Sequence, residues 1–340
     1  MPDYEIGRIV FGSAASIDAA YRLFREQPID ETRLAAEGAP PPFPTWRQTL
    51  ASEAQVAGIG TFHGRDRQTL VFAPSARPGW WIRRMDHPAQ LDTKVDISNL
   101  WTSAQNLVLR SGSPHNYLRM VEHIVALKCG LGVDNVLLKA WSGDPPLFDQ
   151  SSIPLIETMD RAGVVETHET ATYVTVKEPV AFGGSRGDFL LFLPAPEGSH
   201  ALRIDCAISW DTVIGKQRVL FDVTPETFRY AALARTNATH RQYLFVKTIG
   251  RLFAATRNWG YNERNILIHG PRRYYTEPRF HVGDKFLEPV WHRATLDLMA
   301  ALALFGEHRF CGTVVSYRAG HTLDCDAVRA LCRNELLKKA

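Results

Sequence analysis

The stretch that decides the fold is LRMVEHIVALKCGLGVDNVLLKAW, residues 118–141. Its apolar residues recur at helical spacing, and Gly130 and Gly132 suit the end of a helix. The segment VDNVLLKAW that follows has the pattern of a buried strand. Within this apolar context Glu122 and His123 stand side by side near the start of the helix.

Two explanations of this acidic and imidazole pair stay open at this point. In the structural one, the helix dipole favours Glu122 in the first turn and His123 is a hydrogen-bonded core residue. In the chemical one, His123 is a zinc ligand and the neighbouring carboxylate is the general base that takes a proton from water. Zinc needs further ligands, so the pair alone does not decide between them.

Composition limits the class of protein. The chain has 340 residues, 45% of them hydrophobic, and a formal net charge of +3, which is enough for one large or two ordinary domains. The positive charge is dispersed, so we expect a small, uncharged or anionic partner and no nucleic acid. No apolar run is long enough to span a bilayer, which leaves at most peripheral membrane contact.

The cysteines and the N-terminus indicate the compartment. Five cysteines are an odd number, and the sequence has no CxxC pair, so we expect reduced thiols rather than a disulfide framework. The N-terminal segment MPDYEIGRIVFGS lacks the apolar core of a signal peptide. These features predict a cytoplasmic protein.

Three regions follow one another along the chain. Residues 1–45 contain a short strand, a helix and the breaker run GAPPPFPTW, and we interpret them as an N-terminal extension with a proline-rich linker that could hold a protein partner. Residues 46–165 contain strands first and then two helices. Residues 166–340 repeat these ingredients in a similar order. The expected fold class is α+β, with two βα domains of similar topology packed together, helices sandwiched between their sheets, and an N-terminal appendage.

Four spaced blocks resemble the UDP-3-O-acyl-N-acetylglucosamine deacetylases of lipid A synthesis, the LpxC-like enzymes. The resemblance runs from about Trp46 to the end of the chain. The blocks are RQTL with GIG and TLVFAPSARPGWWIRRMD, then VEHIVALKCGLGVDNVLLKAW with DPPLFDQSSIP, then ART in ALARTNA, and GTVVSYRAGHTLDCDAVRAL near the C-terminus. The order of these unusual motifs makes the resemblance specific, and it implies a site at the interface of the two domains.

The resemblance implies a role for each matching residue. Glu122 would be the general base and His123 a ligand of Zn²⁺. His321 would be the general acid or oxyanion partner, and Thr236 would donate a hydrogen bond to the tetrahedral intermediate. Amide hydrolysis suits this set, because it needs an activated water and a proton for the departing amine.

The remaining ligands depart from the family spacing. The family carries them as His-x-x-x-Asp on one helix, followed by a second aspartate, but here the text is EPVWHRATLDLMAALALFG. Asp297 lies five residues after His292, which leaves the two about 140° apart on a regular helix. One alignment keeps His292 as a ligand and Arg293 at a catalytic lysine position, with a π-bulge absorbing the extra residue. The other keeps Asp297 in register and puts Arg293, which has no lone pair for zinc, at the ligand position.

Other departures concern the general acid and the substrate. The second family aspartate would fall at Ala301, so the carboxylate that usually orients His321 is missing. The segment HRQYLFVKTIGRLFAATRNWGYNER carries four arginines where the family builds an apolar acyl passage, which favours a phosphate- or carboxylate-bearing substrate unless those arginines form a solvated face.

Two functions of different classes therefore compete. The first is a zinc-dependent deacetylase that hydrolyses the N-acetyl group of a UDP-linked or related amino sugar, with catalytic residues Glu122, His321, Thr236 and Arg293 and metal ligands His123, His292 and Asp297. The alternative is a catalytically inactive paralogue that binds a sugar nucleotide or a partner. The first is favoured because Glu122, His123, Thr236 and His321 are all present together.

Overall fold

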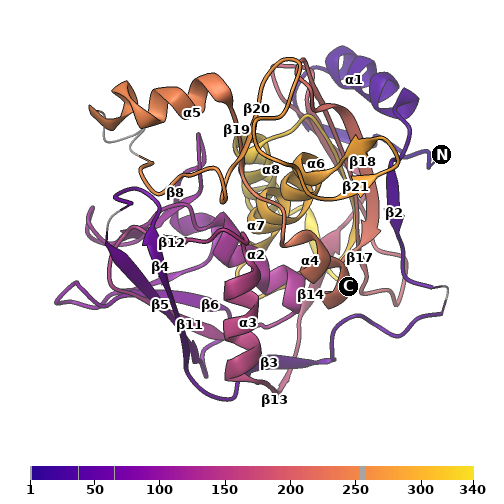
Figure 1. The fold of residues 1–340 in the computed structure, drawn as a ribbon. Coiled ribbons are helices and arrows are strands. Elements are labelled where there is room, and N and C mark those ends of the chain that lie inside the picture. Colours follow the sequence, from indigo (N-terminus) through magenta and orange to yellow (C-terminus); the bar gives the residue numbers. More distant parts are fainter. Residues whose placement is uncertain (1, 37, 65, 253–257) are drawn as a thin grey trace.

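The structure is a computed structural model that describes residues 2–36, 38–64, 66–252 and 258–340. Two large sheets face each other, and a group of helices lies between them (Figure 1). The expected α+β fold of two packed domains is confirmed.

The first sheet is built entirely from the region expected as the first domain. Its six strands follow the order β12-β4-β5-β11-β6-β7. Strand β11 lies between two hairpins, antiparallel to β5 and parallel to β6. The segment around Trp80 forms strand β6, which lies between β11 and the edge strand β7. The bounds are β4 Ala54–Gly60, β5 Arg67–Pro74, β6 Trp80–Arg84, β7 Asp92–Lys94, β11 Val136–Ala140 and β12 Pro146–Leu147.

The second sheet repeats this topology with seven strands in the order β1-β15-β16-β24-β17-β18-β2. Here β24 is the strand inserted between two hairpins, antiparallel to β16 and parallel to β17. Apolar runs such as FLLFL in β16 are buried on both faces. The bounds are β1 Arg8–Phe11, β2 Glu31–Arg33, β15 Val180–Gly183, β16 Phe189–Leu193, β17 Leu202–Trp210, β18 Gly215–Asp222 and β24 Gly312–Tyr317.

The N-terminal region is part of this second sheet and is not a separate appendage. Strand β1 pairs with β15 at one edge, and β2 pairs with β18 at the other. Helix α1 (Ala14–Glu26) lies on the outer face, where Phe24 packs against Phe189 and Tyr317. The expectation of an appendage is wrong because both strands pair with strands of the second sheet. The sequence does not show this pairing, since both strands are short and their partners lie far away in the chain. The domain boundary near residue 165 stays a prediction.

The helices between the sheets carry the motifs of the sequence. Helix α2 (Glu122–Leu131) packs against α7 (Met299–Ala303) at the centre of the molecule (Figure 1). Helix α2 ends at Gly132, whose φ of 69° is left-handed and whose missing Cβ leaves room for Phe43. The other helices are α3 Ile153–Ala162, α4 Pro225–Ala231, α5 His240–Lys247, α6 Glu288–His292 and α8 His321–Arg333.

Smaller strand groups and short helical turns complete the description. None of the helices within the described ranges is long and apolar enough to cross a lipid bilayer. The remaining bounds are β3 Trp46–Leu50 with β13 Val164–Thr170, β8 Leu100–Thr102 with β9 Val108–Arg110 and β10 Tyr117–Leu118, β14 Tyr173–Val176 with β23 Arg309–Phe310 and β25 Leu337–Lys339, β19 Asn237–Thr239 with β20 Leu267–His269, β21 His281–Val282 with β22 Lys285–Phe286, η1 Ile97–Asn99 and η2 Ile249–Leu252.

Candidate active site

A π-helical segment, Arg293–Leu298 (η4), joins α6 to α7. In a π-helix residue i bonds to residue i+5, so the chain takes one extra residue per turn. His292 and Asp297 therefore lie on the same side of the helix, with His292 Nδ1 3.5 Å from Asp297 Oδ1. The helix has the π-helical winding that one of the two alignments expects, while the ligand roles that this alignment assigns stay a prediction.

Three polar side chains from three elements meet beside this helix. His123 Nε2, at the start of α2, lies 3.2 Å from His292 Nε2. The hydroxyl of Thr236 lies 3.0 Å from the first nitrogen and 3.2 Å from the second. Burial and the neighbouring His292 lower the pKa of His123 to about 3, so its imidazole is neutral at pH 7 with a lone pair available.

Groups behind these side chains fix their orientation. The hydroxyls of Ser151 and Ser152 lie 3.4 and 3.5 Å from Nδ1 of His123, so Nε2 faces the site. The guanidinium of Arg235 donates to both carboxylate oxygens of the buried Glu288, at 2.8 and 3.0 Å, which ties the loop before Thr236 to α6. Sequence reasoning missed the roles of Ser151, Ser152 and Glu288; the SSIP run after Asp149 was the available signal.

Glu122 is buried at the first turn of α2, 4% exposed. Its Oε2 accepts a hydrogen bond from the backbone N–H of Leu107 at 3.1 Å. Burial raises the pKa of Glu122, and the charge of the nearby His321 opposes that rise. A carboxylate with a raised pKa next to a histidine suits proton transfer.

His321 is the first residue of α8. Its Nε2 lies 3.5 Å from Asp297 Oδ1, and its Nδ1 is buried without a hydrogen-bond partner. Burial by itself would raise the pKa of Asp297, but His292, His321 and Arg293 hold it well below its ordinary value. The carboxylate therefore stays ionised between two imidazoles. Position 301, four residues further along the chain, is alanine and carries no carboxylate.

Arg293 is the one candidate that the fold does not bring to this group. Its Nε donates to the carbonyl of Ala319 at 2.8 Å, and its Nη2 donates to Asp324 Oδ1 at 2.5 Å. Both ion-pair side chains are buried. These contacts hold the turn before His321 against η4. Sequence reasoning did not single out Asp324.

The donor set fits a tetrahedral cation in part. Two ligand nitrogens on one zinc, each at 2.0–2.1 Å, lie about 3.3 Å apart, close to the 3.2 Å between His123 Nε2 and His292 Nε2. Asp297 Oδ1 is buried and lacks a hydrogen-bond partner. It faces Nδ1 rather than Nε2 of His292, and across the described ranges no three His, Cys, Asp or Glu side chains converge as a formed metal site. Three converging ligands therefore require a side-chain rearrangement within this group.

Comparison with known proteins identifies the family. The family model of UDP-3-O-acyl N-acetylglycosamine deacetylase matches residues 47–333. A protein of Brucella ovis named UDP-3-O-acyl-N-acetylglucosamine deacetylase is 27% identical over 293 residues, which cover 85% of this chain and 96% of the relative. The proteins of that name from Brucella canis and Brucella melitensis match with the same identity and coverage. The chain belongs to the UDP-3-O-acyl N-acetylglycosamine deacetylase family.

Proposed function

We propose that this protein is a zinc-dependent deacetylase that hydrolyses the N-acetyl group of a UDP-linked or related amino sugar. The observation that carries the proposal is the pair of imidazole nitrogens 3.2 Å apart, beside a buried carboxylate, Glu122, and a third histidine, His321. Family membership supports the reaction type, since the relatives are named as deacetylases of UDP-3-O-acyl-N-acetylglucosamine.

His123, His292 and Asp297 would hold the zinc ion. Two imidazoles and one carboxylate are donors that zinc prefers in catalytic sites, where a fourth position stays open. When bound, the ion would supply Lewis acidity, which polarises an amide carbonyl and lowers the pKa of a water.

The chain's own residues perform the proton transfers in this proposal. The Glu122 carboxylate takes a proton from the attacking water. The Thr236 hydroxyl donates a hydrogen bond to the oxygen on which negative charge develops. His321 delivers a proton to the departing amine, and the Asp297 carboxylate, 3.5 Å from its Nε2, stabilises its cationic form. Arg293 acts through the turn that precedes His321.

The substrate follows from chemistry and from the relatives together. An amino sugar bearing an acetamido group is the substrate class, and UDP-3-O-acyl-N-acetylglucosamine, which the names of the relatives give, is the default. A cytoplasmic location agrees with this substrate and with five cysteines that are all free thiols.

Replacing Glu122 tests the reaction directly. In Glu122→Gln the amide cannot accept the proton, so we expect acetate release from UDP-3-O-acyl-N-acetylglucosamine or UDP-N-acetylglucosamine to fall at least ~100-fold. The fold and the metal content should be unchanged. Glu157→Gln, at an exposed position of α3, is the matched control and should keep full activity. Wild-type protein that binds these sugars and releases no acetate would support the inactive, sugar-binding alternative instead.

A further inference from the structure

Helix α5 and the turn η2 that follows it lie at the periphery of the molecule, beside β19 and β20 (Figure 1). All eight residues of α5 belong to the described part of the chain, and none of them is buried. Large apolar side chains of this segment are between 41% and 78% exposed, namely Leu244, Phe245, Ile249 and Leu252. Apolar side chains gathered at the surface of a protein usually mark a contact with a partner.

Positive charge is concentrated around the same segment. Residues 240–273 contain seven arginines and lysines and one acidic residue, Glu263, which gives a formal net charge of +6. The whole chain carries only +3, so the remaining residues carry a net charge of −3. The expectation of dispersed charge is therefore wrong for this segment. Arg257, counted here from the sequence, lies outside the described residues.

An arginine from another part of the chain is held at the start of α5. The ring of Tyr275 stacks on that of His240 with centroids 4.0 Å apart. The guanidinium carbon of Arg273 lies 4.6 Å from the centre of the same tyrosine ring. Arg241, the next residue of the helix, is exposed. Two guanidinium groups therefore lie at the beginning of the helix that exposes its apolar side chains.

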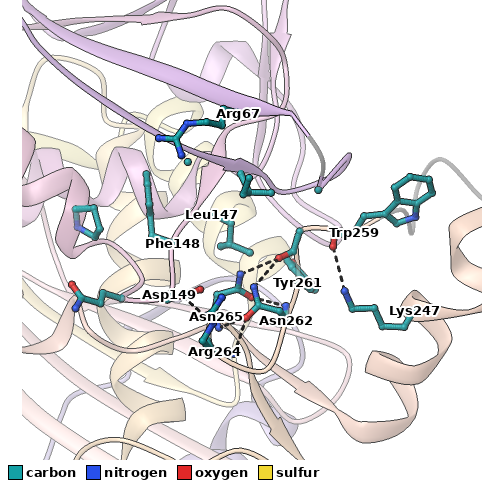
Figure 2. A pocket seen from close by; sticks show the side chains of 16 residues that line it. Arg67, Leu147, Phe148, Asp149, Lys247, Trp259, Tyr261, Asn262, Arg264 and Asn265 are labelled. Atoms are coloured by element: carbon teal, nitrogen blue, oxygen red, sulfur yellow. Dashed lines mark hydrogen bonds and ion pairs between the residues drawn. The ribbon is translucent and has the colours of Figure 1, made fainter.

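The other end of α5 is fastened to the body of the molecule. The ammonium group of Lys247 donates to the carbonyl of Trp259 at 3.2 Å (Figure 2). The backbone N–H of Trp259 in turn donates to the carbonyl of Phe62 at 3.1 Å, just after β4. Because α5 is held at both ends, its exposed side chains are presented by a fixed element, which reduces the ordering cost of an interaction.

Apolar side chains among basic ones favour a lipid surface as the partner. An amphipathic element of this kind places its apolar side chains at the level of the acyl chains, while arginine and lysine contact anionic headgroups. Tyrosine suits the boundary between lipid and water, and Tyr275 is 42% exposed. A nucleic acid would use the same charges, but its phosphates offer side chains such as Leu244 and Ile249 nothing to contact.

We propose that α5 and η2 dock the protein on the surface of a lipid bilayer that contains anionic headgroups, with Leu244, Phe245 and Ile249 entering the interface. Arg241 and Arg273 contact the headgroups beside them. Strand β19 links Thr236 directly to α5, so docking holds the candidate site close to the lipid surface.

Flotation with lipid vesicles tests the proposal on the full chain. The wild type should float with vesicles of phosphatidylglycerol and phosphatidylcholine, and should stay behind with phosphatidylcholine alone. We expect the double variant Leu244→Ser/Phe245→Ser to bind the mixed vesicles at least ~10-fold more weakly, because two apolar side chains no longer enter the interface. The double variant Arg241→Gln/Arg273→Gln should also bind at least ~10-fold more weakly, because two charges beside the headgroups are lost.

Two variants of α1 are the matched controls. Leu23→Ser removes an apolar side chain that is 47% exposed, and Arg22→Gln removes an exposed charge, so both should bind vesicles like the wild type. All the substituted side chains are exposed, and we therefore expect circular dichroism and thermal unfolding to be unchanged in every variant.

A wild type that floats with neither kind of vesicle, or a Leu244→Ser/Phe245→Ser variant that floats as well as the wild type, would overturn the proposal. Two further measurements identify another occupant of the surface. Without vesicle binding, a wild-type dimer that this variant loses would show that a second copy of the chain covers α5. A raised KM of the variant for a 3-O-acylated UDP-sugar, again without vesicle binding, would show that the acyl chain of the substrate does.

Discussion

At the scale of single residues, Asp297 has the most unusual surroundings. One carboxylate oxygen lies 3.5 Å from a nitrogen of His292 and 3.5 Å from a nitrogen of His321. Both imidazoles favour its ionised form, and its pKa is held low although it is buried. In the proposed mechanism, with alanine at position 301, this carboxylate contacts both the proposed ligand His292 and the proposed general acid His321.

The substitution Asp297→Asn should therefore affect two properties at once. The amide keeps the shape but lacks the charge, so we expect metal affinity to fall about 10–100-fold and acetate release at least as far. Elemental analysis and an acetate assay measure the two. Asp160→Asn, which removes an exposed partner of Arg229, should change neither. Normal metal content and normal turnover in Asp297→Asn would show that this carboxylate has neither role.

The ionisation of Asp92 should make the free energy of unfolding depend on pH. Its Oδ1 accepts from Nε of Arg83 at 2.6 Å, and Arg77 also binds this carboxylate. Burial would raise the pKa of Asp92, but the two arginines hold it below its ordinary value. Because the folded pKa is depressed, the stabilisation is fully present above the ordinary value of ~3.9 and is lost as pH falls through the folded one.

For Asp92→Asn we expect a loss of about 1 kcal/mol in the free energy of unfolding at pH 7, after allowing for solvent screening. Urea titrations at pH 7 and pH 3 should show the difference between wild type and variant shrinking at the lower pH. An equal difference at both pH values would mean that the carboxylate charge does not stabilise the fold.

At the scale of elements, the N-terminal helix and its two strands complete the second sheet. Phe24 of α1 is fully buried against the outer face, whereas the neighbouring Leu23 is 47% exposed. The carbonyl of Phe24 also accepts from the guanidinium of Arg218, which forms a buried ion pair with Asp205. The region is therefore tied to the sheet by apolar packing and by a buried polar network.

A pair of adjacent substitutions tests this interpretation. Phe24→Ala removes a buried ring and should cost about 3–5 kcal/mol of unfolding free energy, while Leu23→Ala should change it by less than about 0.5 kcal/mol. Thermal or urea unfolding of the two variants gives the comparison. If both variants match the wild type, α1 would be the loose appendage that the sequence suggested.

Sequence reasoning could foresee some of these elements and not others. The one-residue excess between His292 and Asp297 predicted a π-bulge as one of two alignments, because a local count shows the extra residue. It could not foresee that β1 would pair with β15, because the whole region 46–165 lies between these two strands in the sequence. The contacts of Arg293 with Asp324 and of Arg235 with Glu288 are likewise long-range, and no local pattern encodes them.

At the scale of the whole molecule, the candidate site is shared by the two halves. Glu122 and His123 come from α2, which precedes the inserted strand of the first sheet. His292 and Asp297 come from α6 and η4, which precede the inserted strand of the second. One continuous apolar core connects both helices. The duplicated topology thus brings two equivalent helices together, and each contributes side chains to the candidate site.

The central claim is that this shared site holds a metal ion, and the metal content of the purified protein tests it most directly. Elemental analysis of the wild type should find close to one zinc per chain, His292→Ala should lose most of it, and His168→Ala, at an exposed position of β13, should keep it. Wild-type protein without zinc after supplementation, or an unchanged content in His292→Ala, would contradict the claim.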